Sequence, residues 1–324
     1  MAKLSIVEAI NLALRQEMKR DKSVLVLGED VGVDGGVFRA TEGLLKLFGK
    51  ERVIDTPLSE SGIIGTSIGL AIAGMKPVAE IQFDGFIYPG FDQLISHAAR
   101  MRTRSRGAYS CPLVVRAPYA GGIKALEHHS ESMEALYRHI PGLKVVIPST
   151  PSDAKGLLIS AIRDPDPVLF LEPKRLYRAL REEVPEKEYL IPLGRSKIVQ
   201  EGSDVTVVSY GASMHETKKA LAELNEKFSI ELIDVRTISP LDDETIITSV
   251  KKTGRCVIVH EGPRSCGLAA EIIARINEKA LLSLKAPVVR VTGFDTVMPL
   301  AKLEWEYIPT VSRIKKAIFE VTAF

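Results

Sequence analysis

The sequence has few cysteines and little net charge. Its three cysteines, Cys111, Cys256 and Cys266, show no CxxC spacing, which argues against a zinc site or a disulfide framework and fits a reducing compartment. The net charge of +2 lacks the basic excess of a nucleic-acid-binding protein. Residues 63–75 are too short and glycine-rich to span a membrane, and the N-terminus lacks the apolar core of a signal peptide. We therefore expect a cytoplasmic protein with no nucleic-acid or membrane partner.

A recognisable phosphate-binding loop is also missing. Residues 32–39 (GVDGGVFR) are rich in glycine, but they have neither the GxGxxG spacing nor the lysine of GxxxxGK[ST]. We interpret this stretch as a turn, which leaves the chain without a convincing cradle for phosphate groups.

Length and composition indicate two packed domains. The chain has 324 residues, of which 45% are hydrophobic and 26% charged. Strand and helix patterns alternate through both halves, which predicts an α/β fold of two doubly wound, mainly parallel sheets. Residues 172–191 are rich in Pro, Glu, Lys and Arg without an apolar period, so we expect an interdomain connection there. We place the domains at 1–185 and 186–324.

The pattern also predicts individual elements. Ser5 and Glu8 form a capping-box pattern that opens the first helix. Helices are predicted over 6–19, after Glu60, and over 93–104, 152–162, 213–227, 243–251 and 268–279. Strands are predicted over 24–28, 78–83, 113–117, 143–148, 168–171, 205–209, 230–235, 256–260 and 288–291.

Glu60 is an isolated acid ahead of a long stretch of small and aliphatic residues. No charged residue follows it until Lys76, and Gly62, Gly65 and Gly69 leave a bare stripe on the predicted helix. A carboxylate in apolar surroundings is costly unless something pairs with it. Two interpretations stay open: a carboxylate that holds a hydrogen bond to a ligand nitrogen, or an ordinary helix N-terminal acid favoured by the macrodipole.

Two adjacent histidines, His128 and His129, follow a Gly-Gly turn. Histidine gives or takes a proton near neutral pH, so proton transfer or substrate binding is one interpretation and an exposed loop is the other. Because HxxxH and HExxH spacings are absent, a metal site is the least favoured interpretation.

Aromatic residues gather after the predicted strand 78–83. Phe83, Phe86, Tyr88 and Phe91 lie within nine positions and would offer a flat wall for a heteroaromatic ring, although an ordinary core gives the same pattern. Asp92 in this stretch is a candidate for a paired or protonated acid.

Several blocks together resemble one family, the beta subunit of the thiamine-diphosphate-dependent decarboxylase component of 2-oxoacid dehydrogenase complexes. The resemblance runs nearly end to end. The blocks are GEDVG at 28–32, GGVFRATEG at 35–43, DTPLSE at 55–60, EIQF at 80–83, HHSES at 128–132, PGLKVVIP at 141–148, DAKGLL at 153–158 and RTISP at 236–240.

The resemblance implies a pyrimidine-binding domain followed by a transketolase-type C-terminal domain. It also implies an α2β2 heterotetramer in which thiamine diphosphate is shared, with its diphosphate and Mg²⁺ held by a GDG…N motif of the alpha subunit. This chain contains no GDG, which agrees with half of an active site. The glycine stripe after Glu60 would be a subunit contact.

The resemblance also assigns roles to residues. Glu60 matches the glutamate that bonds the pyrimidine ring nitrogen and activates the cofactor, and His129 matches a histidine directed towards substrate and lipoyl chemistry, with His128 the weaker choice. Leu58, Gln82 and Phe86 match positions of the cofactor pocket. Some relatives have Tyr in place of Phe86, so a hydroxyl contact is lost here.

A structural potassium ion is a further implication of the resemblance. The family often holds it mostly through backbone carbonyls, at positions that match Leu113, Ala161, Asp164 and Asp166. Relatives often have Asn in place of Asp166.

The implied reaction is oxidative decarboxylation of a 2-oxoacid, followed by acyl transfer to lipoamide on the acyltransferase component. Residues 86–93, 127–132 and 172–175 favour branched-chain 2-oxoacids, with pyruvate as the alternative. A second alternative is a mainly structural subunit that docks the acyltransferase component. A transketolase or deoxyxylulose-phosphate synthase is disfavoured because such chains are far longer and carry GDG…N.

Overall fold

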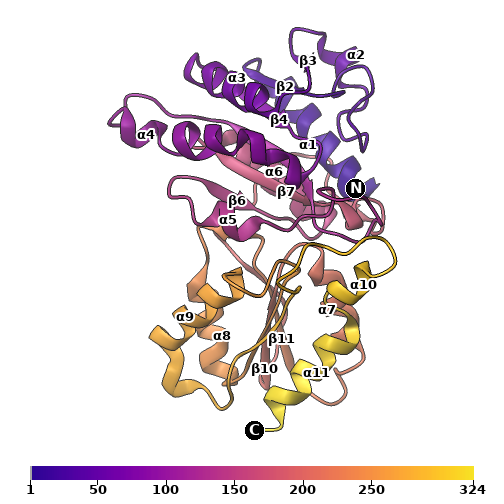
Figure 1. Cartoon of the computed structure of the whole chain (residues 1–324), viewed down its shortest axis with the longest axis vertical. Coiled ribbons are helices and arrows are strands. Elements are labelled where there is room, and N and C mark those ends of the chain that lie inside the picture. Colours follow the sequence, from indigo (N-terminus) through magenta and orange to yellow (C-terminus); the bar gives the residue numbers. More distant parts are fainter. Residues whose placement is uncertain (1) are drawn as a thin grey trace.

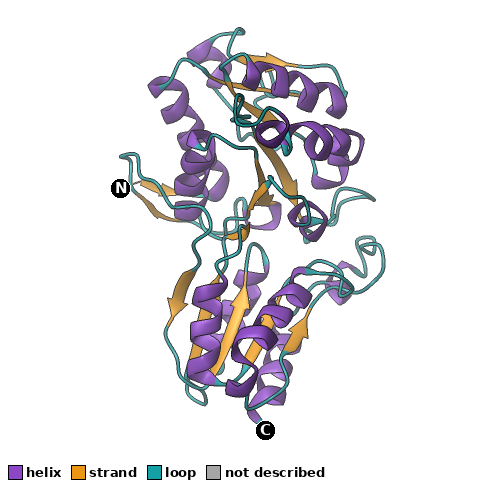
Figure 2. Ribbon diagram, turned by 90° about the vertical axis from the view of Figure 1, so that its left-hand side faces the viewer, coloured by secondary structure: helices purple, strands orange, loops and turns teal. Residues whose placement is uncertain are grey.

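Short runs of valine, leucine and isoleucine form two mainly parallel sheets in the computed structural model, which describes residues 2–324. Figure 1 shows the two α/β halves one above the other, with the N-terminus near their junction and the C-terminus at the far end of the second half. In Figure 2 the strands of each half lie between helices. The predicted fold class of two α/β domains is confirmed.

The first half is built on a seven-stranded sheet with the order β12-β6-β7-β5-β4-β2-β3, in which only the β12–β6 pair is antiparallel. Its strands are β2 (Val24–Gly28), β3 (Val53–Asp55), β4 (Lys76–Glu80), β5 (Val114–Tyr119), β6 (Lys144–Val146), β7 (Val168–Pro173) and β12 (Thr237–Ser239). The strand order changes direction between β2 and β4. A crevice outside the carboxyl ends of the strands at such a reversal is where ligands bind in open α/β sheets.

The second half is built on a five-stranded sheet with the order β14-β13-β10-β11-β9, in which only β9 is antiparallel. Its strands are β9 (Lys197–Gln200), β10 (Val205–Ser209), β11 (Ile230–Asp234), β13 (Cys256–Val259) and β14 (Val289–Val291). The strand β12 comes from this half of the sequence but pairs with β6, so it joins the two halves.

Helices cover both sheets. In the first half they are α1 (Ile6–Arg20), α2 (Leu44–Phe48), α3 (Glu60–Ile72), α4 (Met101–Arg104), α5 (Glu134–Arg138) and α6 (Pro151–Arg163). In the second half they are α7 (Ser213–Ala222), α8 (Asp243–Thr253), α9 (Leu268–Ala280), α10 (Glu304–Tyr307) and α11 (Val311–Thr322). Shorter 3₁₀ or π turns are η1 (Asp84–Gly90), η2 (Gln93–Ala98), η3 (Lys174–Leu176) and η4 (Leu281–Ser283). The helix pairs α1–α6, α8–α9 and α7–α11 pack together.

The predicted capping box is present at the start of α1. The Ser5 backbone N–H donates to the Glu8 carboxylate at 2.7 Å, and the Glu8 N–H donates back to the Ser5 hydroxyl at 3.5 Å. Ile6, Ile10 and Leu14 of this helix are fully buried. The cap therefore fixes where α1 begins, and burial of its apolar face contributes most of its stability.

Several elements differ from the sequence-based prediction, and three of the differences lie in the first half of the chain. The strand β4 ends at Glu80 because the 3₁₀ turn η1 takes over the next segment, and the helix predicted over 93–104 is divided into η2 and α4. Residues 172–191 are not only a connection. Glu172 is buried on β7 beside Arg116, and β8 (Glu182–Val184) pairs with β1 (Ala2–Leu4). The domain boundary at 185/186 stays a prediction.

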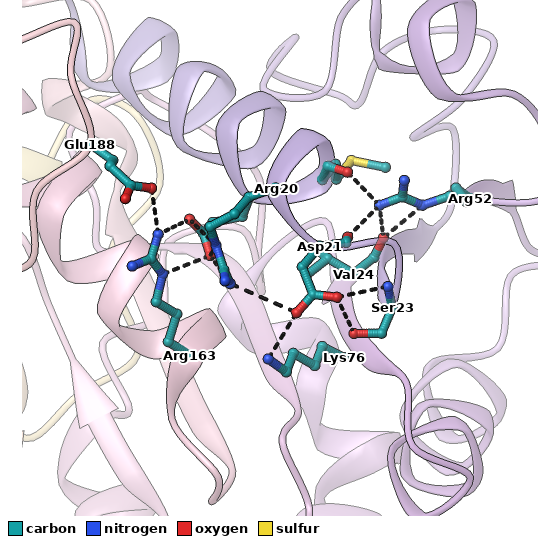
Figure 3. Close-up of polar contacts among 10 residues, drawn as sticks. Arg20, Asp21, Ser23, Val24, Arg52, Lys76, Arg163 and Glu188 are labelled. Atoms are coloured by element: carbon teal, nitrogen blue, oxygen red, sulfur yellow. Dashed lines mark hydrogen bonds and ion pairs between the residues drawn. The ribbon is translucent and has the colours of Figure 1, made fainter.

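At the amino end of the first sheet lies a polar cluster whose charged groups all have hydrogen-bond partners within the chain (Figure 3). The Asp21 carboxylate accepts hydrogen bonds from the Ser23 hydroxyl at 2.6 Å and the Lys76 ammonium at 3.0 Å. The Arg52 guanidinium donates to the carbonyls of Met18, Asp21 and Val24. These contacts join the end of α1 to the starts of β2 and β4. No helix within residues 2–324 has the length and apolar character needed to cross a bilayer.

Candidate active site

Chemically active side chains meet at the carboxyl edge of the first sheet, where its strand order reverses. Glu29 and Asp30 follow β2, Glu60 opens the helix after β3, and Gln82 lies just beyond β4. The loop with His129 follows β5. Residues far apart in the sequence therefore share one edge because the strands are parallel.

Glu60 is the first residue of α3, after the N-cap Ser59, whose hydroxyl accepts a hydrogen bond from the Gly62 N–H at 3.3 Å. The Glu60 side chain is half-buried and forms no hydrogen bond or ion pair with any of residues 2–324. Burial raises the pKa of Glu29, and the negative charges of Glu60 and Asp30 raise it further. The site thus holds three acids close together, and Glu60 is free for a ligand.

The start of α3 lies close to the turn that carries Phe86. The Ser61 hydroxyl donates a hydrogen bond to the Pro89 carbonyl. A Cβ on Gly90 would lie 2.6 Å from Ile64 Cδ1 and 3.1 Å from the Glu60 carbonyl oxygen. Only glycine allows this approach, so Gly90 sets how near Glu60 comes to η1.

Phe86 of η1, the turn that packs against α3, belongs to an aromatic wall with Phe83 and His129. The rings of Phe83 and Phe86 meet edge to face with centroids 5.3 Å apart. The His129 ring lies 4.4 Å from that of Phe83 and 5.0 Å from that of Phe86. Such edge and tilted contacts are typical of stable aromatic clusters. The structure therefore brings Phe86 and His129, both predicted site residues, into contact.

The two histidines have different surroundings. His129 is half-buried, and its Nδ1 lies 2.8 Å from the Glu127 carbonyl oxygen. His128 has a φ of 64°, its side chain is exposed, and its Nδ1 lies 3.6 Å from Glu131. The geometry supports His129 as the residue that faces the site.

The remaining pocket candidates occupy separate positions. The Gln82 amide donates to Asp30 at 3.1 Å, so it lies at the acid cluster. Leu58 is 77% exposed just before the cap of α3. Asp92 is exposed and accepts a hydrogen bond from the Ser96 hydroxyl at 2.7 Å, so it is paired.

The four positions implied for potassium lie away from Glu60. Leu113 precedes β5 at the amino edge, and its carbonyl accepts from Val168, as that of Ala161 does from Asp164. Lys144 lies 2.6 Å from Asp164, and Arg102 lies 2.7 Å from Asp166. The Leu113 and Ala161 carbonyl oxygens each keep a second lone pair, whereas the Asp164 and Asp166 carboxylates already pair with Lys144 and Arg102. The potassium ion at these positions stays a prediction.

The arrangement at Glu60 fits the aminopyrimidine end of thiamine diphosphate. An unpaired carboxyl group is available for a ring nitrogen, and aromatic side chains offer an apolar face beside it. Nothing comparable serves a diphosphate in the described part of the chain, since the cluster at this edge is acidic.

Sequence reasoning left some contributors out of the site. Phe83 was assigned only to an aromatic stretch, yet it makes the nearest ring contact of His129. Glu29 and Asp30 appeared only within the GEDVG block at 28–32 and were not predicted as neighbours of Glu60. Their position could have indicated a role in the site, since both follow a buried strand of a parallel sheet.

Comparisons with known proteins agree with this geometry. The pyrimidine-binding domain of transketolase matches residues 2–179, and the transketolase C-terminal domain matches residues 194–314. A solved structure described as a split-gene transketolase, an inactive beta4 tetramer, is similar with a TM-score of 0.79 at 22% identity, covering 99% of both chains. That likeness supports the fold.

Curated relatives carry a more specific name. The pyruvate dehydrogenase E1 component subunit beta of Acholeplasma laidlawii is 56% identical over 97% of this chain and 96% of its own length. The protein of the same name from Bacillus subtilis is 52% identical over the whole of both chains. The chain therefore belongs to the thiamine-diphosphate-dependent family of 2-oxoacid dehydrogenase beta subunits.

Proposed function

We propose that this chain is the beta subunit of a pyruvate dehydrogenase, which decarboxylates pyruvate oxidatively and passes the acetyl group to lipoamide on an acyltransferase component. The observation that carries the catalytic part is the unpaired, half-buried Glu60 at the start of α3, the helix that packs against the turn with Phe86 and its contact to His129. The names of the relatives support pyruvate. The branched-chain preference expected from the sequence finds no support among them.

Glu60 is the residue that prepares the cofactor. Bound thiamine diphosphate supplies the carbon nucleophile that attacks the 2-oxo group and the electron sink that permits loss of carbon dioxide. Glu60 would hold the pyrimidine ring nitrogen of the bound cofactor by a hydrogen bond from its carboxyl group. Phe83 and Phe86 keep water from one side of that contact and orient the ring.

His129 handles a proton at its Nε2. A carbonyl oxygen only accepts hydrogen bonds, so the contact to Glu127 places the proton of the neutral imidazole on Nδ1. Nε2 is then the free, basic nitrogen. It is suited to exchange a proton with the substrate or with the lipoyl thiol.

The proposal includes partners because the site is incomplete. The acids at the sheet edge repel a diphosphate, so an alpha subunit would hold that group and its Mg²⁺ in an α2β2 assembly. Leu58 and Leu126 support this, since they flank the two catalytic residues and are 77% and 74% exposed. Covering them would exclude water from the site. Cytoplasmic location and the potassium ion stay predictions.

The decisive experiment reconstitutes the chain with its alpha subunit, thiamine diphosphate and Mg²⁺. We expect kcat/KM for pyruvate to exceed that for 4-methyl-2-oxopentanoate by at least about 10-fold, a margin that small pockets achieve against larger side chains. A preference for the branched substrate would overturn the assignment to pyruvate. Full activity after replacement of both Glu60 and His129 would instead support the structural docking subunit.

A further inference from the structure

We infer that the second half of the chain positions His129, by holding the first residues of the loop that carries it. We call residues 120–132, between β5 and α5, the histidine loop. Glu261 and Glu304 are the positioning residues, and neither is sequence neighbour to the loop. The inference rests on the proposed function, since the role of His129 belongs to that proposal.

Glu304, on α10, binds two backbone amides of the histidine loop. Its Oε1 accepts a hydrogen bond from the Gly122 N–H at 2.7 Å, and its Oε2 accepts one from the Lys124 N–H at 3.1 Å. The Glu304 side chain is buried, with 2% of its surface exposed. Figure 1 shows α10, in yellow, at the junction of the two halves. A buried carboxylate with two amide donors forms charge-assisted bonds, which are the stronger kind.

Glu261, just after β13, binds the backbone of Gly121, the residue before Gly122 in the histidine loop. Its carboxylate accepts the Gly121 N–H, and it also pairs with the Arg175 guanidinium at 2.8 Å. Arg175 in turn donates to the Gly121 carbonyl at 3.0 Å. A Cβ on Gly121 would lie 2.7 Å from Met298 Cε, so the backbone is enclosed by the second half of the chain.

The histidine loop needs these carboxylates because its own backbone is irregular. Ala120, Gly122 and Lys124 have φ values of 69°, 95° and 57°, outside the strand and helix regions. Positive φ keeps these residues out of a regular sheet ladder, so each of their N–H groups needs another partner. Glu304 supplies that partner for two of the three, and the third, Ala120 N–H, donates to the Glu131 carbonyl at 2.7 Å.

The anchored residues connect to His129 through a short exposed stretch. Leu126, Glu127 and His128 are exposed, while the His129 ring lies against Phe83 and Phe86. The loop is thus held at its start by the second half of the chain and at its end by the aromatic wall. Loss of the first anchor would let the His129 ring leave the wall, and misplacement of a catalytic group lowers the rate steeply.

Hydrogen exchange in the assembled α2β2 enzyme tests the anchor directly, independent of any role of His129. Glu304→Ala should accelerate amide exchange of Gly122 and Lys124. Glu304→Gln keeps one acceptor oxygen, which can reach both N–H groups, so it should accelerate exchange less than Glu304→Ala. Glu306→Ala, two residues further along the same helix and exposed, is the matched control. Unchanged exchange in both Glu304 variants would overturn the inference.

A double-mutant cycle then tests whether the anchor acts through His129. We expect Glu304→Ala to lower kcat for acetyl transfer about 10-fold with little change in KM for pyruvate, but less than about 2-fold in a His129→Ala background. Glu304→Gln should recover part of the loss. Equal losses in both backgrounds would show a merely structural role and overturn the inference. No loss in His129→Ala alone would overturn the proposed role of His129, and the exchange result would still decide the anchor.

Discussion

Two groups of charged side chains, one at each end of the seven-stranded sheet, differ in whether they have partners within the chain. At the amino end, the Asp21 carboxylate binds Ser23 and Lys76, and Arg52 binds three carbonyl oxygens (Figure 3). At the carboxyl end, Glu29 and Glu60 lie together, and neither has a cationic partner among residues 2–324. Elsewhere at the carboxyl end, Arg116 pairs with Glu80 and Glu172. The contrast therefore lies between the amino end and the Glu29–Glu60 pair, which is the part that we propose an alpha subunit completes.

The difference follows from the direction of the strands. Helix N-termini with free N–H groups meet the carboxyl ends of parallel strands, and they favour acids such as Glu60. Chain turns at the amino end serve only to connect elements, so their polar groups are bonded to each other. Uncompensated charge at one edge of a sheet thus points to function, and saturated charge points to stability.

The largest contrast should appear when one acid at each end loses its charge. Glu60→Gln should lower decarboxylation by at least about 100-fold, the scale of a lost proton-transfer or hydrogen-bonding group. Asp21→Asn should leave decarboxylation within about 2-fold, because Asp21 lies at the opposite edge. Turnover of both variants in the assembled enzyme, with saturating thiamine diphosphate, is the measurement.

Assembly must be checked alongside that comparison. Size-exclusion chromatography should show an intact α2β2 species for both variants, and Glu226→Gln, an exposed glutamate after α7, serves as the neutral control. Near-normal turnover of Glu60→Gln would refute its assignment as the activating residue.

The second prediction concerns stability at the amino end. Arg52→Ala removes the guanidinium hydrogen bonds to the Met18, Asp21 and Val24 carbonyls and a cation–π contact with Phe48 at 5.3 Å. We expect the free energy of unfolding to fall by roughly 2–3 kcal/mol, with kcat retained at low temperature. Urea unfolding followed by circular dichroism measures the change. A variant as stable as the parent would show that water replaces the guanidinium at no cost.

The sequence predicts this architecture well where elements are regular. The strands 24–28 and 205–209 match the structure residue for residue, because their short length and their valine-rich composition favour a buried strand over a helix. The irregular parts were harder. The helix α11 (Val311–Thr322) was not predicted, and the η2 segment was assigned to an ordinary helix.

The site was predicted in part, and the limit is physical. Glu60, Phe86 and His129 were predicted as site residues through family motifs, which preserve short blocks in order. The anchors Glu261 and Glu304 could not be found in that way, since their partners are backbone amides about 140 and 180 residues away in sequence. The charge cluster of Glu29 with Glu60 likewise depends on strand order, which the sequence does not display.

The third prediction uses acid pH to separate the two ends. The Ser23 hydroxyl and then the Lys76 ammonium hold the pKa of Asp21 well below its usual range. A depressed folded-state pKa contributes stability above the unfolded value of about 3.9, and this contribution is lost as pH falls through the folded pKa. Asp21→Asn should therefore lower the apparent Tm at pH 7, and the gap to the parent should close below about pH 4. A gap independent of pH would mean that the hydrogen bonds, not the charge, stabilise this end.

The smallest effect should have the opposite sign, at the carboxyl end. Burial, and then the charges of Glu60 and Asp30, raise the pKa of Glu29. An acid whose folded-state pKa is raised binds more protons when folded, so it costs stability above that pKa, and the cost disappears as pH falls towards the unfolded value of about 4.3. Glu29→Gln should raise the apparent Tm by roughly 1–2 °C at pH 8 and leave it unchanged near pH 4. Thermal scans of the beta chain alone give this comparison, and a lower Tm at pH 8 would mean that Glu29 already has a stabilising partner, which would end the contrast between the two edges.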